Sequence, residues 1–158
     1  MQIQYEALDS DLVVGWRAGS GDAYGNPAER VISDGDGNPC RHCLEFVQEG
    51  AVMLILAHRP FGALQPYAET GPIFLCADGC SRGGGRDLPV ILKSSRDYLL
   101  KAYSVDERII YGTGMVVLKD DVAAYAASLL DRPEVAFVDV RSARNNCFQL
   151  RIRRAGAS

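Results

Sequence analysis

The sequence predicts an α+β fold that is largely antiparallel, with a loop-rich N-terminal region and one clear C-terminal helix. Two apolar runs, at residues 52–57 and 73–76, have the composition of buried strands. Apolar and polar residues alternate over positions 148–153, as in a strand with one buried face. Strands and helices do not alternate regularly along the chain, which favours an antiparallel sheet over a parallel one.

The N-terminal part, residues 1–38, is dense in residues that favour turns. Gly, Asn, Asp and Pro gather there in three clusters. Only two short helices are expected in this part, near residues 12–16 and 27–33. An ordered but loop-rich opening therefore precedes the core, residues 39–158.

Two hairpins are expected in the middle of the chain. Residues 44–47 pair with the apolar run 52–57 through a turn at residues 48–50, and that run is expected to be a central strand. Residues 98–104 and 108–118 are expected to form the second hairpin, and a helix over residues 93–103 is the alternative. The predicted sheet is therefore built mainly from strands that are close in sequence.

The clearest helix covers Val122–Leu130, because its apolar residues recur at helical spacing. Asp120 and Asp121 are expected to cap its start, and Pro133 follows its end. A strand at residues 135–140 comes next, and a turn joins it to the last strand. Five arginines belong to this tail, and we expect an exposed strand whose charges discourage edge pairing: Arg141, Arg144, Arg151, Arg153 and Arg154.

Composition limits the classes of protein that fit. The chain has 158 residues, of which 47% are hydrophobic, which suits a single domain over residues 1–158 that buries roughly two thirds of its unfolded surface. Such a domain needs no metal or disulfide merely to fold. The net charge of −3 argues against a protein that binds nucleic acid over its whole surface.

Location follows from similar arguments. The N-terminus has neither a basic segment nor an apolar one of the kind that signal peptides carry. The longest apolar run, residues 51–57, is too short to span a bilayer, so we expect no membrane partner and a cytoplasmic protein. Five cysteines, an odd number, favour reduced thiols or metal ligands over a disulfide framework.

Residues 39–44 concentrate more chemical capacity than any other segment, because Cys40 and Cys43 flank Arg41 and His42. A Cys-x-x-Cys pair can bind a metal, form a disulfide or hold an activated thiolate. For zinc, Cys40 and Cys43 supply half of a four-ligand site. Cys76 and Cys80 are candidates for the other half, although their spacing is looser, and the spare candidates are His42 and Cys147.

A thiol-dependent enzyme is an alternative that uses the same segment. Arg41 and His42 are cationic groups that favour the thiolate of Cys40 or Cys43, and Glu69 is a candidate general base. The hairpin expected after Cys43 counts against a thioredoxin-like site, which needs a helix there. The sequence therefore leaves zinc binding and thiol chemistry both open as alternatives.

The leading hypothesis is a module that binds a small anionic ligand or a protein partner. Arginine and asparagine side chains at one turn offer planar donors for a carboxylate or phosphate, and equally for loop carbonyls. Other polar groups lie at the ends of predicted strands. The candidate ligand-binding residues are His58, Arg59, Tyr67, Arg141, Arg144, Asn145 and Asn146.

Five segments, in order along the chain, resemble the uncharacterised bacterial family called domain of unknown function 1203. They are residues 39–44, 59–61, 66–74, 111–114 and 140–148. The resemblance runs from about Pro39 to the end of the chain and implies a short, single-domain bacterial protein without an established activity. In that family a histidine often stands where this chain has Cys76, and either residue can ligate a metal.

Overall fold

The computed structural model describes residues 1–157, and the chain divides into two compact units. The first, called here the six-stranded unit, contains Met1–Glu6 and the chain from Gly84 onward. The second, called here the cysteine unit, is Ala7–Gly83. Strands outnumber helices in both units and pair antiparallel, so the predicted α+β class is confirmed. The expectation of a single domain stays a prediction.

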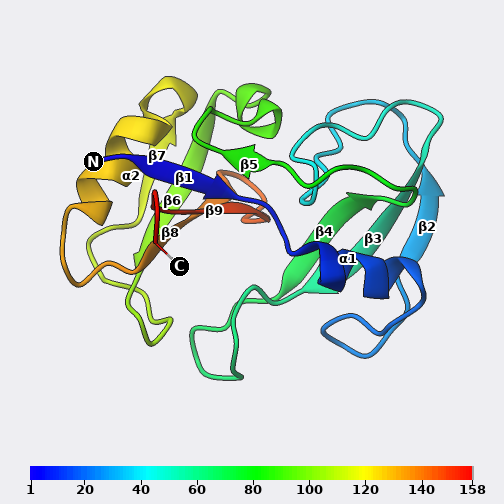
Figure 1. Ribbon diagram of the computed structural model, residues 1–158, viewed down its shortest axis with the longest axis horizontal. Helices are drawn as coiled ribbons and strands as arrows, with labels where there is room; N and C mark the ends of the chain where they lie inside the picture. Colours follow the sequence, from blue (N-terminus) through cyan, green and yellow to red (C-terminus); the bar gives the residue numbers. More distant parts are fainter. Residues whose placement is uncertain (158) are drawn as a thin grey trace. The chain divides into compact units, whose positions relative to one another are not determined.

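The six-stranded unit is built on one antiparallel sheet. Its strands, in spatial order, are β5 (Gly84–Gly85), β1 (Ile3–Glu6), β9 (Phe148–Arg154), β8 (Phe137–Ser142), β6 (Asp97–Tyr103) and β7 (Met115–Leu118). The second predicted hairpin is present as β6 and β7, with Tyr98 opposite Val117. The C-terminal hairpin is present as β8 and β9 (Figure 1).

Helix α2 of this unit is Val122–Leu130, the range predicted from its apolar spacing. Val122, Ala126 and Leu130 are fully buried, which explains the periodicity. The short helices η1 (Val90–Lys93) and η2 (Lys119–Asp121) precede it in the chain. The predicted cap is wrong in one respect, because Asp121 stands at the N-cap but its side chain makes no capping hydrogen bond.

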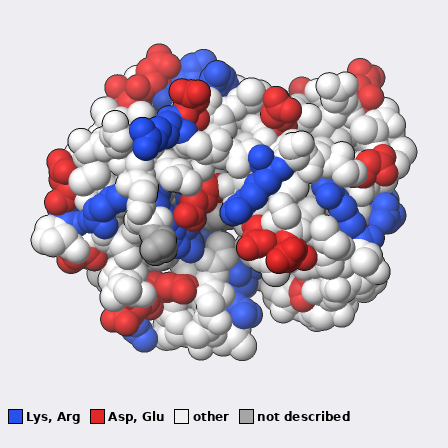
Figure 2. Space-filling model, viewed as in Figure 1, with Lys and Arg blue, Asp and Glu red and all other residues white. Residues whose placement is uncertain are grey.

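The arginines of β9 do not protect a sheet edge, because β9 lies between β1 and β8. Arg151 donates two hydrogen bonds to the buried carboxylate of Asp139, at 2.7 and 3.0 Å. Arg153 donates to Glu6 at 3.0 Å. The edge interpretation is therefore wrong, since part of the basic tail is neutralised by acidic partners on neighbouring strands. Acidic and basic side chains are interspersed on the face shown in Figure 2.

The cysteine unit contains helix α1 (Ser10–Arg17) and a three-stranded antiparallel sheet of β2 (Glu29–Ile32), β3 (Val52–His58) and β4 (Gly71–Cys76). The predicted central strand is confirmed, since β3 lies between β2 and β4 (Figure 1). The helix expected near residues 27–33 is wrong, because Glu29–Ile32 of that segment form strand β2. Apolar side chains from α1, β3 and β4 form the core of this unit, and Cys40 is buried among them.

The hairpin expected between residues 44–47 and 52–57 is also wrong. Residues 41–43 form a turn, and the only pairing of the segment that follows is an isolated bridge from Phe46 to Pro39. Strand β3 pairs with β4 and β2 instead, and Leu54 of β3 lies opposite Leu75 of β4. None of the described helices is long and apolar enough to cross a membrane.

Candidate metal centre

The first half of the site is a tight turn that contains Cys40 and Cys43. Leu44 N donates to Cys40 O at 2.9 Å, and Cys40 N donates to Glu45 O at 2.9 Å. Leu44 closes the turn with a φ of 59°, a left-handed conformation that is rare for a non-glycine residue. Arg41 N donates to Phe74 O at 3.1 Å, which fixes the turn beside β4. The turn thus carries two thiols to the end of that strand.

The second half of the site is the end of β4 and the loop after it. Cys76 is the last residue of β4, and Ala77 N donates to Val52 O at 3.1 Å, so the chain turns at the end of the sheet. The loop then folds back over the end of the strand, which brings the sulfur of Cys80 close to that of Cys76. Gly83 N donates to His42 O at 2.8 Å and ties the loop to the first turn.

Close approach explains why glycine stands at position 83. A Cβ atom there would lie 2.2 Å from the carbonyl oxygen of Cys43 and 2.7 Å from its carbon. Real Cβ atoms do not come so near to backbone atoms, so any other residue would push the two halves apart. A Cβ atom added to Gly79, in the same loop, would have no neighbouring atom within 4 Å.

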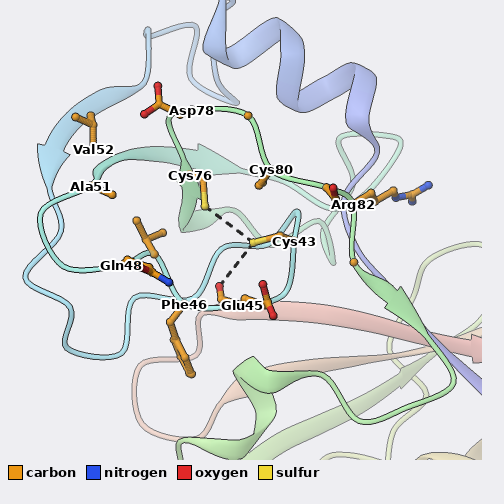
Figure 3. Close-up of a pocket in the computed structure, with 14 residues that line it drawn as sticks. Cys43, Glu45, Phe46, Gln48, Ala51, Val52, Cys76, Asp78, Cys80 and Arg82 are labelled. Carbon is orange, nitrogen blue, oxygen red and sulfur yellow. Dashed lines mark hydrogen bonds between the residues drawn. The ribbon is translucent and has the colours of Figure 1, made fainter.

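The four sulfur atoms of Cys40, Cys43, Cys76 and Cys80 all lie within 4.8 Å of one another. Cys40 and Cys80 are 4.0 Å apart, as are Cys43 and Cys76. Zn–S bonds of about 2.3 Å place the corners of a tetrahedron about 3.8 Å apart. The cluster therefore has the size of the ligand shell of a single tetrahedral ion. Figure 3 shows Cys76 and Cys43 pointing toward each other.

Several N–H groups point at the sulfur atoms of Cys40 and Cys80. Cys76 N donates to Cys40 Sγ at 3.3 Å, and Arg17 Nη2 donates to Cys80 Sγ at 3.2 Å. His42 Nδ1 lies 3.1 Å from Cys80 Sγ. Such donors stabilise thiolates and are typical of the groups that surround metal ligands in proteins.

His42 is held in place from its other side. Its Nε2 atom lies 2.8 Å from Ser10 Oγ, at the start of α1. If that hydroxyl donates to Nε2, the neutral ring carries its proton on Nδ1, which faces the sulfur of Cys80. Burial lowers the pKa of His42, and the positive charges of Arg17 and Arg82 lower it further, against the opposing effect of Cys40. The neutral form of the His42 ring is therefore favoured beside the sulfur of Cys80.

The thiols perturb one another strongly. Hydrogen bonds from Cys43 and Cys76 lower the pKa of Cys40, so the thiolate form is favoured at this sulfur. The hydrogen bond to Cys40 raises the pKa of Cys43 to about 12. The same partner raises the pKa of Cys76. In the absence of a cation, negative charge thus concentrates on Cys40, and further ionisation of Cys43 and Cys76 is unfavourable.

A pocket of about 590 Å³ adjoins the cluster. Cys43, Cys76 and Cys80 line it, and its remaining walls come from residues 45–48, 51–52, 78–79 and 81–83. Cys40 is not among the lining residues and is fully buried. The cluster thus has one side in the core of the unit and one side open to a cavity (Figure 3).

The other candidate residues of the cysteine unit lie outside the cluster. His58 is buried with its ring 5.3 Å from that of Trp16 in an edge-to-face arrangement. Arg59 Nε donates to Phe61 O at 3.4 Å. Tyr67 and Glu69 belong to the segment before β4, where Glu69 N donates to Tyr67 O at 3.0 Å. None of these four is among the residues that line the pocket beside the sulfurs.

The remaining candidates belong to the six-stranded unit. Arg144 donates to Asp97 at 2.8 Å, and Arg141 donates to the carbonyl of Asn146 at 2.9 Å. Asn145 accepts a contact from Cys147 Sγ at 3.7 Å. Carbonyl groups of the loop thus accept part of the hydrogen bonds of this turn, which is one of the two roles that the sequence allowed for these side chains. Participation of these residues in one site with the cysteines stays a prediction, as does binding of an anion.

Sequence reasoning missed Arg17 and Ser10. Both lie in α1, more than thirty positions before the nearest group that they contact in the site, and no motif connects them to the cysteines. Arg41, by contrast, was noted as a cation beside the thiols. Its guanidinium lies 5.6 Å from the centre of the Phe74 ring and donates to Pro39 O at 2.7 Å.

The fold and the cluster together define a small α+β protein with four cysteines close enough to one another to hold a metal ion. The chain belongs to the family described as protein of unknown function (DUF1203), which residues 37–154 match. This confirms the resemblance noted in the sequence. Searches of curated proteins and of solved structures found no match to the chain.

Proposed function

We propose that this is a zinc-binding protein in which Cys40, Cys43, Cys76 and Cys80 hold one Zn²⁺ ion. The observation that carries the proposal is the mutual distance of the four sulfurs, all within 4.8 Å. Four thiolates in a tetrahedron are a preferred ligand set of zinc in structural sites. No rearrangement of the backbone is needed to bring the four ligand atoms together.

The ligand type and the size of the cluster favour a single soft ion. Thiolates select zinc, copper(I) and iron over magnesium or calcium, which prefer oxygen ligands. Sulfurs that bind an iron–sulfur cluster ligate different iron atoms, which spreads them further apart than the edge of one tetrahedron. Among single ions with four thiolate ligands, zinc is the usual choice in proteins.

The role of the ion in this proposal is structural. Four protein ligands leave no open position for a substrate or for an activated water on the metal. The ion joins the turn at Cys40 and Cys43 to Cys76, at the end of β4, and to Cys80 in the loop that follows, and both the turn and the loop are otherwise irregular. Zinc thereby stabilises two adjoining loops beside the core of the cysteine unit.

The donors around the sulfurs support this assignment. Arg17 and His42 both contact Cys80, which is half-buried. A neutral thiol gains little from a guanidinium and an imidazole, whereas a thiolate in a centre with a formal charge of −2 gains from each of them. The charge of the surrounding groups therefore complements a metal-bound cluster.

The test is the metal content of the purified protein, measured by elemental analysis together with protein concentration. We expect one zinc per chain in the wild type and in Cys147→Ser, the matched control, because Cys147 lies in the other unit. Cys76→Ser should lose most of the zinc. Replacement of zinc by cobalt should give the visible spectrum of a tetrahedral tetrathiolate site. A folded wild-type protein that binds no zinc at micromolar concentration contradicts the proposal.

A further inference from the structure

Three of the four cysteines of the centre line an open cavity. Cys43, Cys76 and Cys80 belong to the wall of the pocket of about 590 Å³, and each of them is half-buried, whereas Cys40 is fully buried. Figure 3 shows the three side chains together at this pocket. A small molecule in the cavity can therefore reach the ligand shell while the cysteine unit stays folded.

The four sulfurs are also close enough to form bonds with one another. All of them lie within 4.8 Å, and the pairs Cys40–Cys80 and Cys43–Cys76 are 4.0 Å apart. A disulfide bond is about 2.05 Å long, so a shift of roughly 2 Å converts such a contact into a bond. Residues 79–83 have no regular secondary structure, so the segment that carries Cys80 can make a shift of this size.

The charge of the cluster changes when its sulfurs are oxidised. A centre of Zn²⁺ and four thiolates has a formal charge of −2, whereas disulfides are neutral. Cys40 is fully buried, so a neutral state of its sulfur is favoured once the cation has left. Oxidation also removes the anionic partner of Arg17, whose Nη2 donates to Cys80 Sγ at 3.2 Å, because a neutral sulfur is a weak acceptor. The contact between α1 and the loop that carries Cys80 is therefore weaker in the oxidised state.

We propose that hydrogen peroxide oxidises the four thiolates of the zinc centre to two disulfides and releases the ion. The proposal rests on the zinc site proposed above and adds a redox reaction to it. Zinc keeps the sulfurs deprotonated at neutral pH, and the thiolate is the form of cysteine that peroxides oxidise. A small neutral oxidant suits the pocket, because Glu45 and Asp78 line it and the centre itself is negative.

Hydrogen peroxide is the oxidant in this reaction, and solvent supplies the protons. One thiolate forms a bond to a peroxide oxygen, the O–O bond breaks, and hydroxide leaves with its electron pair. A neighbouring thiolate then attacks the sulfenic acid, so that the S–S bond forms, the S–O bond breaks and a second hydroxide leaves. Two protons convert these hydroxides to water. Each disulfide thus consumes one peroxide, and zinc leaves as Zn²⁺ because its thiolate ligands are lost.

The experiment uses zinc-loaded Cys147→Ser protein, so that all remaining cysteines belong to the centre. Zinc content is measured first, which separates failure of the zinc site from failure of this inference. Hydrogen peroxide is then added, zinc release is followed with a chromogenic chelator against a sample without peroxide, and disulfides are identified by mass spectrometry. We expect loss of all the zinc with two peroxides consumed per ion, and recovery of the zinc content after reduction and addition of zinc.

Two results overturn the proposal. One is retention of zinc over the time in which N-acetylcysteine is oxidised under the same conditions. The other is loss of zinc with formation of sulfinic acids in place of disulfides, because the sulfurs would then react with peroxide faster than with one another.

A pair of variants tests the role of the pocket. Ala51→Phe introduces a bulky ring at a residue that lines the cavity, whereas Leu64→Phe introduces the same ring at an exposed position outside it. Both variants should bind one zinc per chain. Release of zinc by peroxide should be several-fold slower in Ala51→Phe than in Leu64→Phe, because the ring restricts access to the thiolates. Equal rates in the two variants overturn entry of the oxidant through this pocket.

Discussion

Removal of zinc should lower the melting temperature of the protein without abolishing its fold. The proposed ion would join Cys43 to Cys76 and so close a loop of roughly 30 residues, which in the chain-entropy description of a cross-link contributes about 4 kcal/mol. For a chain of this size, that loss corresponds to a fall in melting temperature of roughly 10 °C. The fold should survive, because the cysteine unit has its own apolar core around Leu54, Leu56 and Leu75.

The assay is differential scanning calorimetry of the protein before and after treatment with a chelator under reducing conditions. Elemental analysis must show that the zinc has left, and added zinc should restore the original melting temperature. Cys147→Ser should respond like the wild type, because that cysteine is not part of the cluster. A change below about 2 °C after complete removal of zinc would refute the structural role, since it corresponds to less than about 1 kcal/mol.

Three further predictions concern particular residues. Gly83→Ala should weaken zinc binding, because its Cβ would lie 2.2 Å from the carbonyl oxygen of Cys43, whereas Gly79→Ala should leave zinc affinity unchanged. Competition with a zinc chelator measures the affinity of both variants. Equal affinities would contradict the close approach of Gly83 to Cys43. Zinc affinity should rise at least about tenfold per pH unit between pH 6 and 8, because the pKa of Cys43 is raised to about 12 and its proton must leave when the ion binds. A zinc affinity that does not change with pH would argue against Cys43 as a ligand. Asp139→Asn should lower the free energy of unfolding by about 3 kcal/mol, measured by urea unfolding, because it breaks a buried ion pair with Arg151. A decrease below about 1 kcal/mol would show that the ion pair is dispensable for stability.

Periodicity and composition predicted the regular elements well. Helix α2 was predicted over its observed range because its buried positions repeat at helical spacing and a proline follows. The strands β3 and β4 were predicted from apolar runs, which reflect burial within the cysteine unit. In these segments the side chains that form the core also determine the local pattern, so the sequence alone is informative.

The wrong predictions lie where tertiary contacts determine the conformation. Strand β2 is exposed at all four positions, so it carries no pattern of alternating burial. Its extended conformation comes from pairing with β3, which sequence periodicity cannot show. The turn after Cys40 depends on Leu44 in a left-handed conformation, for which leucine has no preference. The expected hairpin there was an argument against a thioredoxin-like site, and although the hairpin is absent, no helix follows Cys43 in residues 44–51 either, so that argument still holds.

The ligand residues of the candidate site could be named from the sequence, but their convergence could not. Cys76 and Cys80 have a looser spacing than a usual zinc knuckle, and only the fold of the loop brings Cys80 back. That fold depends on the approach of Gly83 to Cys43, which leaves no local signature beyond the glycine itself. Arg17 comes from a helix far away in sequence, so its contact with Cys80 requires the packed unit.

Packing alone explains the four cysteines less well than a metal does. Cysteine is a common small apolar residue in cores, and Cys40 is fully buried. Apolar packing does not account for a guanidinium at 3.2 Å and an imidazole nitrogen at 3.1 Å from one sulfur, because a neutral thiol is a weak acceptor. It also does not account for four thiols whose sulfur atoms all lie within 4.8 Å of one another. The proposed divalent cation would explain both features, since it would allow four thiolates to coexist and would give the surrounding donors a negative centre to stabilise.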